Sequence, residues 1–275
     1  MLALLLVPAL LGLALFIDED TGGDDSDIVN SSEEDAIDPV EGNDESNLIF
    51  TEGGNDFIQA NGGADTIDSG AGNDTIYAGD GDDSVIGGEG DDLIFLGDGE
   101  DIYVAEEDEV TDRGNDIIRG GSGDDGIVDF RGSDTLYGDD GDDVLAAFGI
   151  GNTPDAPDTL DGGSGEDVLF GDNGDILTGG DGADIFAAIQ PASVDTEAVT
   201  ITDFEIEKDT LIVFVPEAND PAEEIELRYD SDENALRAFW RDEEVAVLNG
   251  LNDSDASNVD ISIIDAADLQ LAGFA

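Results

Sequence analysis

The stretch that decides the fold runs from residue 51 to residue 104 and reads TEGGNDFIQ ANGGADTID SGAGNDTIY AGDGDDSVI GGEGDDLIF LGDGEDIYV. It consists of six uninterrupted copies of one nine-residue unit. Each copy has Gly at its fourth position, Asp at its sixth and an apolar side chain at its eighth. A fixed short period of this kind predicts a solenoid, in which each repeat stacks on its neighbours.

The same unit continues in two further blocks. After AEEDEV (105–110) come TDRGNDIIR, GGSGDDGIV, DFRGSDTLY and GDDGDDVLA (111–146). After AFGIGN (147–152) come TPDAPDTLD, GGSGEDVLF, the eight-residue GDNGDILT and GGDGADIFA (153–187). Over these 14 copies the sixth residue is always Asp and the eighth is always apolar. A degenerate unit, GNDESNLIF (42–50), precedes them and is a candidate cap of the stack.

This spacing predicts an all-β fold, a parallel β-roll over residues 42–187. The last three residues of each unit form a short extended segment with one inward apolar side chain, and the first six form a glycine-rich turn. Two units therefore make one coil, and stacked coils build two facing parallel sheets. We expect the eighth-position side chains to be the only core, which makes that core thin.

Composition narrows the chemistry that the turns can support. The chain has 7 basic and 72 acidic residues, a formal net charge of −65. Such a polyanion opposes its own compaction unless cations neutralise it, and nucleic acid is an unfavourable partner. Because Cys and His are both absent, disulfides, thiolate or imidazole metal sites and histidine-based triads are excluded. Hard oxygen ligands remain, and these suit Ca²⁺ or Mg²⁺.

The turns of the repeat favour calcium. Glycine adopts positive φ and lets backbone carbonyls converge, and the sixth-position Asp supplies a carboxylate. Calcium accepts 6 to 8 oxygens in irregular geometry, whereas Mg²⁺ requires a tighter octahedron. We therefore expect several Ca²⁺ ions between stacked turns, and repeats that stay largely disordered without them.

The unit also matches G-G-x-G-x-D-x-U-x, and the chain resembles the RTX family of calcium-binding repeat proteins over residues 51–187. The resemblance implies that each Ca²⁺ lies between units n and n+2, for example between Asp56 and Asp74. The predicted carboxylate ligands are Asp56, Asp65, Asp74, Asp83, Asp92, Asp101, Asp116, Asp125, Asp134, Asp143, Asp158, Asp167, Asp175 and Asp184. The predicted glycine contributors are Gly54, Gly63, Gly72, Gly81, Gly90, Gly99, Gly123, Gly141, Gly165 and Gly182.

The number of sites depends on the two insertions. Blocks of 6, 4 and 4 units contain 8 same-side pairs if the insertions break the stack, and 12 if they loop out of it. Three turns depart from the family pattern. One contains Phe130 and Arg131, one contains Pro154, Ala156 and Pro157, and the shortened unit that contains Asp175 lacks its fifth residue.

Three segments flank the predicted roll. Residues 1–17 form an apolar run without a clear basic flank or cleavage site, and three interpretations stay open: a membrane anchor, a signal, or an incidental arm. They are the only part of the chain for which we expect membrane contact. Residues 18–41 are acidic and poor in aromatic residues, which predicts a disordered linker. Residues 188–275 contain alternating segments such as TLIVFV (210–215), which predict a small antiparallel β cap.

The C-terminal segments TITDF (200–204), ALRAFW (235–240) and AADL (266–269) resemble the C-terminal region of serralysin-type secreted proteins. That resemblance implies an uncleaved signal for a type I exporter, and hence the type I secretion machinery as a partner. The protease domain of that family has no counterpart here, because the chain has no His for an H-E-x-x-H motif.

These observations predict a secreted or surface-associated calcium-binding protein with a structural role and no catalytic residues or further cofactor. Three other functions stay open: an adhesin, an ice-binding module, and a carbohydrate-acting module or accessory of a type I secreted enzyme system. Paired carboxylates can cleave glycosides, but aromatic residues that could hold a sugar are few, and Trp240 is the only Trp.

Overall fold

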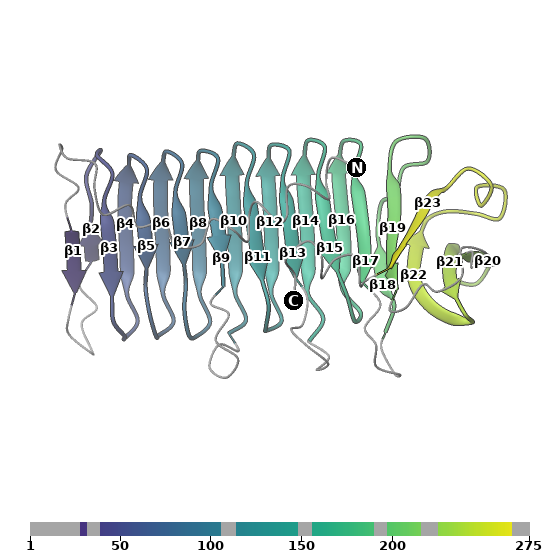
Figure 1. Ribbon diagram of the computed structural model, residues 1–275, viewed down its shortest axis with the longest axis horizontal. Helices are drawn as coiled ribbons and strands as arrows, with labels where there is room; N and C mark the ends of the chain where they lie inside the picture. Colours follow the sequence, from purple (N-terminus) through teal and green to yellow (C-terminus); the bar gives the residue numbers. More distant parts are fainter. Residues whose placement is uncertain are drawn as a thin grey trace.

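The computed structural model describes residues 28–31, 39–105, 114–147, 156–189, 197–215 and 225–265. These residues form one elongated roll of two facing sheets, in which the strands succeed one another along the long axis (Figure 1). Within these ranges the chain consists of strands and turns without a helix, and so has none that could cross a bilayer. The predictions for residues 1–17 concern a segment outside the described residues.

Consecutive strands of the roll alternate between the two sheets. Sheet A contains, in spatial order, β1 (Ile28–Ser31), β3 (Leu48–Thr51), β5 (Thr66–Asp68), β7 (Ser84–Ile86), β9 (Ile102–Val104), β11 (Gly126–Asp129), β13 (Val144–Ala147), β15 (Val168–Gly171), β17 (Ile185–Ile189), β19 (Thr210–Val215) and β23 (Asp260–Asp265). Sheet B contains β2 (Pro39–Glu41), β4 (Phe57–Gly62), β6 (Thr75–Asp80), β8 (Leu93–Asp98), β10 (Ile117–Ser122), β12 (Thr135–Asp140), β14 (Thr159–Ser164), β16 (Ile176–Asp181), β18 (Val199–Ile201), β22 (Glu243–Asn249), β21 (Ala235–Trp240) and β20 (Glu226–Asp230). This confirms the parallel β-roll with two units per coil.

The two insertions do not interrupt the stack. Strand β10 pairs with β8 in the same register that β8 keeps with β6, so Ile118 lies opposite Ile94 across the first insertion. Strand β14 continues the pairing of β12 across the second insertion. The eight-residue unit also keeps the register, with Leu177 opposite Leu160. The roll is therefore continuous, as in the alternative with 12 same-side pairs.

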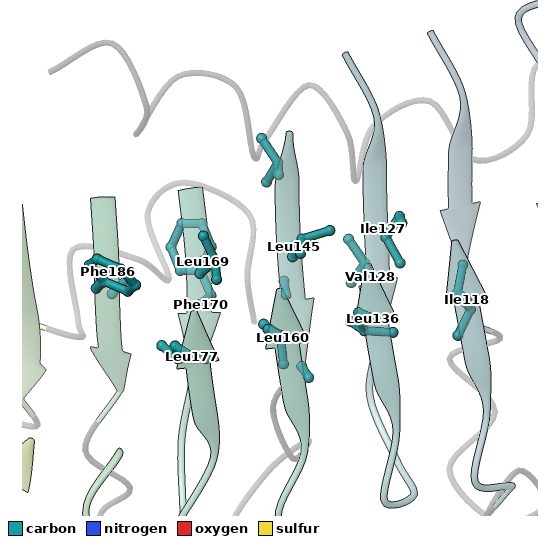
Figure 2. Close-up of a cluster of buried hydrophobic side chains, with 14 of the residues drawn as sticks. Ile118, Ile127, Val128, Leu136, Leu145, Leu160, Leu169, Phe170, Leu177 and Phe186 are labelled. Carbon is teal, nitrogen blue, oxygen red and sulfur yellow. The ribbon is translucent and has the colours of Figure 1, made fainter. Parts of the chain in front are cut away.

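The eighth-position side chains form the core, as predicted. Figure 2 shows part of this column between the sheets, from Ile118 to Phe186. Each of the 14 side chains is at most 1% exposed. They are Ile58, Ile67, Ile76, Val85, Ile94, Tyr103, Ile118, Ile127, Leu136, Leu145, Leu160, Leu169, Leu177 and Phe186. Ile49 of the degenerate unit continues the column, so residues 42–50 form part of the stack.

The expectation that these are the only core residues is wrong. The sheet B strands of the repeats are six residues long, so a second side chain, two residues further along, also points inward. Ala60, Ala78 and Leu96 occupy this position and are fully buried. The inward layer is therefore wider than a single column at the start of the roll, and glycine fills the same position from Gly120 onward.

The ends of the roll differ from the predicted boundaries. Parallel pairing extends past residue 187, because β18 and β19 continue the two sheets and β22 and β23 pair with them in parallel. Among the described strands, β20, β21 and β22 alone form the expected antiparallel unit. Strands β1 and β2 lie within residues 18–41, so the predicted disorder is wrong at those two short segments.

Adjacent isoleucines of β10 provide a test of this packing. Ile118 is fully buried, whereas Ile117 on the opposite face is 43% exposed. We expect Ile118→Ala to lower the free energy of unfolding of the calcium-loaded protein by about 2–5 kcal/mol. Ile117→Ala should lower it by less than about 1 kcal/mol. Urea unfolding followed by circular dichroism measures both, and equal losses would contradict the assigned strand faces.

Candidate metal centre

The predicted aspartates lie in two rows, one along each edge of the roll. The row at edge 1 precedes the sheet B strands and consists of Asp56, Asp74, Asp92, Asp116, Asp134, Asp158 and Asp175. The row at edge 2, at the top of Figure 1, precedes the sheet A strands and consists of Asp65, Asp83, Asp101, Asp125, Asp143, Asp167 and Asp184. All 14 side chains are buried. Each edge thus carries a column of carboxylates within the turns.

Hydrogen bonds connect the members of each row. The backbone N–H of Asp56 donates to Oδ1 of Asp74 over 2.8 Å, and the N–H of Asp65 donates in the same way to Asp83. The bond recurs at all 12 same-side pairs with distances of 2.6–3.0 Å. The structure therefore brings together units n and n+2 along the whole roll.

The second carboxylate oxygen has a different environment. Oδ2 is buried and has no hydrogen-bond partner in Asp56, Asp65, Asp74, Asp83, Asp101, Asp125, Asp143 and Asp167. A buried acceptor without a partner is costly, and an unpaired buried charge costs more. A bound cation would satisfy these oxygens and neutralise the charge. The residues present therefore fit calcium.

The glycines bring further oxygens to the same turns. Gly72 has a φ of +150°, and a Cβ built on it would lie 1.7 Å from the carbonyl oxygen of Gly54. Gly81 stands in the same relation to Gly63 at edge 2, with 2.2 Å. A side chain at Gly72 or Gly81 would therefore collide with the turn two units earlier. Glycine lets carbonyls and carboxylates of successive turns approach closely, in a set of hard oxygen donors that Ca²⁺ prefers.

Burial makes these aspartates reluctant to ionise without metal. Desolvation raises the pKa of Asp83 to about 7, although the N–H of Asp65 counteracts the shift and the charge of Asp101 adds to it. Desolvation likewise raises the pKa of Asp125 to about 8, again with a contribution from Asp101. In the metal-free roll, protons therefore compete for the carboxylates that a cation would neutralise.

One turn holds an additional carboxylate that the sequence reasoning missed. Carboxylate oxygens of Asp116, Asp129 and Asp134 lie within 4.8 Å of one another, and all three residues are buried. Asp129 is the only acidic residue at the first position of a unit, and its Oδ1 accepts the N–H of Phe130 over 2.6 Å. Burial, with the Asp129 charge next, raises the pKa of Asp134 to about 10. The first position of the unit often holds Gly, so an acidic residue there was the sequence signal that could have identified this cluster.

The row at edge 2 continues at both ends onto residues outside the 14 predicted aspartates. The N–H of Asn47 donates to Oδ1 of Asp65, and the N–H of Asp184 donates to Oδ1 of Asp209. The sequence D-T-L at 209–211 keeps the spacing of the repeat, so Asp209 could have been recognised. Asp175 differs from its row, because its Oδ2 accepts the N–H of Asp172 over 2.6 Å. Its role as a calcium ligand stays a prediction, as it does for the other 13 aspartates.

Two rows of buried carboxylates on a parallel roll define a calcium-binding β-roll. A family model of the RTX calcium-binding nonapeptide repeat, four copies long, matches residues 41–76, 69–103, 110–145, 155–175 and 175–188. The roll belongs to this family. A comparison with curated proteins finds no match. Among solved structures, the extracellular lipase LipA from Serratia marcescens is similar, with 16% identity, a TM-score of 0.25 and coverage of 82% of this chain and 40% of the lipase. The chain thus spans less than half of that protein's length.

Two neighbouring aspartates of one turn allow the contribution of the buried aspartate row to be distinguished from that of general negative charge. Asp83 is buried and lies between Asp65 and Asp101 in its row, whereas Asp82 is exposed. We expect Asp83→Asn to raise the calcium concentration needed for half-maximal folding about tenfold, because a charged ligand is lost. Asp82→Asn should change it little. Calcium titration followed by circular dichroism compares them, and equal shifts would indicate diffuse neutralisation instead.

The raised pKa values also predict how pH acts on the calcium-free protein. The folded roll holds protons more tightly than the unfolded chain, so protonation favours folding. This stabilisation is complete below the ordinary Asp pKa of about 4 and is lost as pH rises through about 6 to 8, the range of Asp74, Asp83 and Asp125. In chelator, β signal should therefore increase as pH falls from 8 to 4. A calcium-free protein whose β content is constant over this range would contradict the assignment.

Proposed function

We propose that this protein is an extracellular, non-enzymatic structural protein whose roll folds when calcium enters the turns. The observation that carries this proposal is the double row of buried carboxylates, in which the Oδ2 atoms of eight aspartates have no hydrogen-bond partner. The ligands would be the 14 predicted aspartates together with carbonyls of the fourth-position glycines. Calcium supplies the charge compensation that the roll itself lacks.

Calcium binding and folding are coupled in this proposal. Successive carboxylates of one row are linked through a single backbone N–H, as between Asp65 and Asp83, so their charges are close. Ordering the many turn glycines adds a large entropic cost, and the narrow core offers limited apolar burial to offset either effect. Because the sites require stacked turns, binding free energy appears as folding free energy.

An extracellular location follows from the same requirement. Cytosolic calcium is scarce, so the repeats would remain unfolded before export and fold where calcium is plentiful. The absence of Cys means that calcium would replace the disulfides that stabilise many secreted domains. The resemblance of the C-terminal region to serralysin-type proteins supports the type I secretion machinery as the export partner.

The proposal that the protein has no catalytic activity is based on the residue types in its sequence. The chain has no His or Cys, which removes the usual bases and nucleophiles other than carboxylates and hydroxyls. The buried aspartates have a consistent role as calcium ligands. Trp240, the only Trp, is 4% exposed and thus poorly placed to hold a substrate.

A second candidate, an adhesive or carbohydrate-binding role, is favoured by aromatic side chains on the outer face of sheet B. Tyr77 and Phe95 stack with ring centroids 4.8 Å apart, and Phe57 lies 5.8 Å from Tyr77. Arg119 lies over the ring of Tyr137 on the same face. Exposed aromatic rings offer flat apolar surfaces of the kind that sugar rings contact. Tyr77→Ala should then reduce binding to a glycan array without altering calcium-dependent folding.

Calcium should switch the purified protein between two states. In chelator near pH 7.5 we expect weak β signal and rapid proteolysis of residues 42–187. Millimolar Ca²⁺ should produce a cooperative gain of β signal, and equal Mg²⁺ should do little. Fluorescence of the buried Trp240 reports whether the C-terminal strands fold in the same transition. Equal β content and proteolytic resistance with and without calcium would refute coupled folding.

The route of export can be tested by two deletions in the producing cells. Removing the last ~50 residues should retain the protein inside the cell, because the proposed signal lies near the C-terminus. Removing residues 1–17 should leave export intact. The opposite pattern, with export lost only on removal of residues 1–17, would favour a conventional N-terminal signal. Immunoblots of medium and cell fractions distinguish these outcomes.

A further inference from the structure

Sheet A presents an unusually apolar outer face in a protein of this charge. Along each strand, the residues flanking the inward eighth position point away from the interior. From β9 to β19 these outward positions are almost all apolar. We call this set the apolar strip, and it consists of Ile102, Val104, Val128, Val144, Ala146, Val168, Phe170, Ile185, Ala187, Ile212 and Phe214.

Six members of the apolar strip are buried, namely Val128, Val144, Ala146, Phe170, Ala187 and Phe214, and the other five are partly buried. On the outer face of sheet B, Ile117 and Ile176 are 43% and 42% exposed, whereas Val128 and Phe170 of the strip are 2% and 6% exposed. Phe170 and Phe214 approach each other across β17, with ring centroids 6.4 Å apart. The described elements that pack extensively on β11, β13, β15 and β17 are neighbours in sheet A or strands of sheet B. The described part of the chain therefore does not supply an extensive cover for this face.

We propose that the N-terminal segment, residues 1–17, docks along the apolar strip as an intramolecular cover. This segment, MLALLLVPALLGLALFI, is a long uncharged apolar run. Coiled as a helix it would be about 25 Å long. The strip spans six strands, β9 to β19, and five spacings of ~4.8 Å amount to about 24 Å. The two lengths agree, and Pro8 would bend such a helix without changing its reach greatly.

The connection between the segment and the roll permits this arrangement. Strand β1 begins at Ile28, at the outer end of sheet A, four strand spacings or about 19 Å from β9. Residues 18–27 can extend to about 33 Å. The linker can therefore return along sheet A and place residue 17 near β9, from where the segment would run toward β19.

Charge favours this occupant over a second copy of the chain. Each copy carries a net charge of −65, so two rolls meeting face to face would repel each other strongly. Residues 1–17 contain no charged side chain. Tethering by a short linker also gives the segment a high effective concentration at the strip. The segment then acts as part of the folded protein, in place of an anchor in a membrane.

Cleavage in the linker tests the docking in the full calcium-loaded protein. A protease recognition sequence replaces residues 21–26, and the cut protein is passed over a gel-filtration column in calcium. We expect the N-terminal fragment to co-elute with the roll. The double substitution Val128→Asp with Phe170→Asp should abolish co-elution, whereas Ile117→Asp on the outer face of sheet B should not.

A second measurement covers the case in which the double variant does not fold. Deleting residues 1–17 should preserve the calcium-induced β signal and increase the fluorescence of an apolar dye, and added synthetic peptide 1–17 should reverse that increase. Separation of the fragment from the unsubstituted roll would overturn the proposal. Flotation of the uncut protein with phosphatidylcholine vesicles would also overturn it, because the segment would then be inserted in the bilayer.

Discussion

The structure depends on one repeated interaction, the bond from the backbone N–H of a sixth-position Asp to the carboxylate of the same-side turn two units later. It fixes each turn on the next, but it places negative charges in columns through the protein. Oδ1 of each aspartate is used within the protein and Oδ2 is left for a cation at eight positions. Without a cation, the bond that stacks the turns also brings their carboxylate charges close together. The repulsion between these charges then opposes folding. The dependence on calcium therefore follows from the fold itself.

Glycine makes this arrangement sterically feasible at two different positions. At Gly72, which is the fourth residue of its unit, a side chain would collide with the carbonyl of Gly54 two units earlier. At the first position, as in Gly120, a Cβ would lie 2.2 Å from Oδ2 of Asp125, so glycine leaves room for the carboxylate. In the early sheet B strands, this first position of the unit holds Ala60, Ala78 and Leu96 in place of glycine. The roll thus exchanges apolar burial for space around the carboxylates along its length, which increases its reliance on metal.

The sequence was sufficient for the parts of the molecule that repeat. The period predicted the parallel sheets, the inward column and the n, n+2 pairing, because each depends only on contacts between like positions. It could not decide whether the insertions interrupt the stack, since that depends on the register of β8 with β10. It also missed Asp129, which reaches Asp116 and Asp134 only because the coil closes. Strands β22 and β23 join the two sheets in parallel although no period marks them.

The basic residues indicate how the protein stabilises the end of the roll, where the calcium turns stop. Four of the seven, Lys208, Arg228, Arg237 and Arg241, lie after residue 200. Arg237 forms ion pairs with Asp230, Glu233 and Glu244, and Arg228 pairs with Glu226 and Asp242. Exposed pairs of this kind contribute modestly to stability, and they neutralise five acidic residues of this region. The antiparallel strands β20, β21 and β22 thus compensate charge within the chain, whereas the roll takes its compensating charge from solution. Such a terminal unit can be ordered at lower calcium than the repeats, and it then offers β18 a formed edge on which the roll can be stacked.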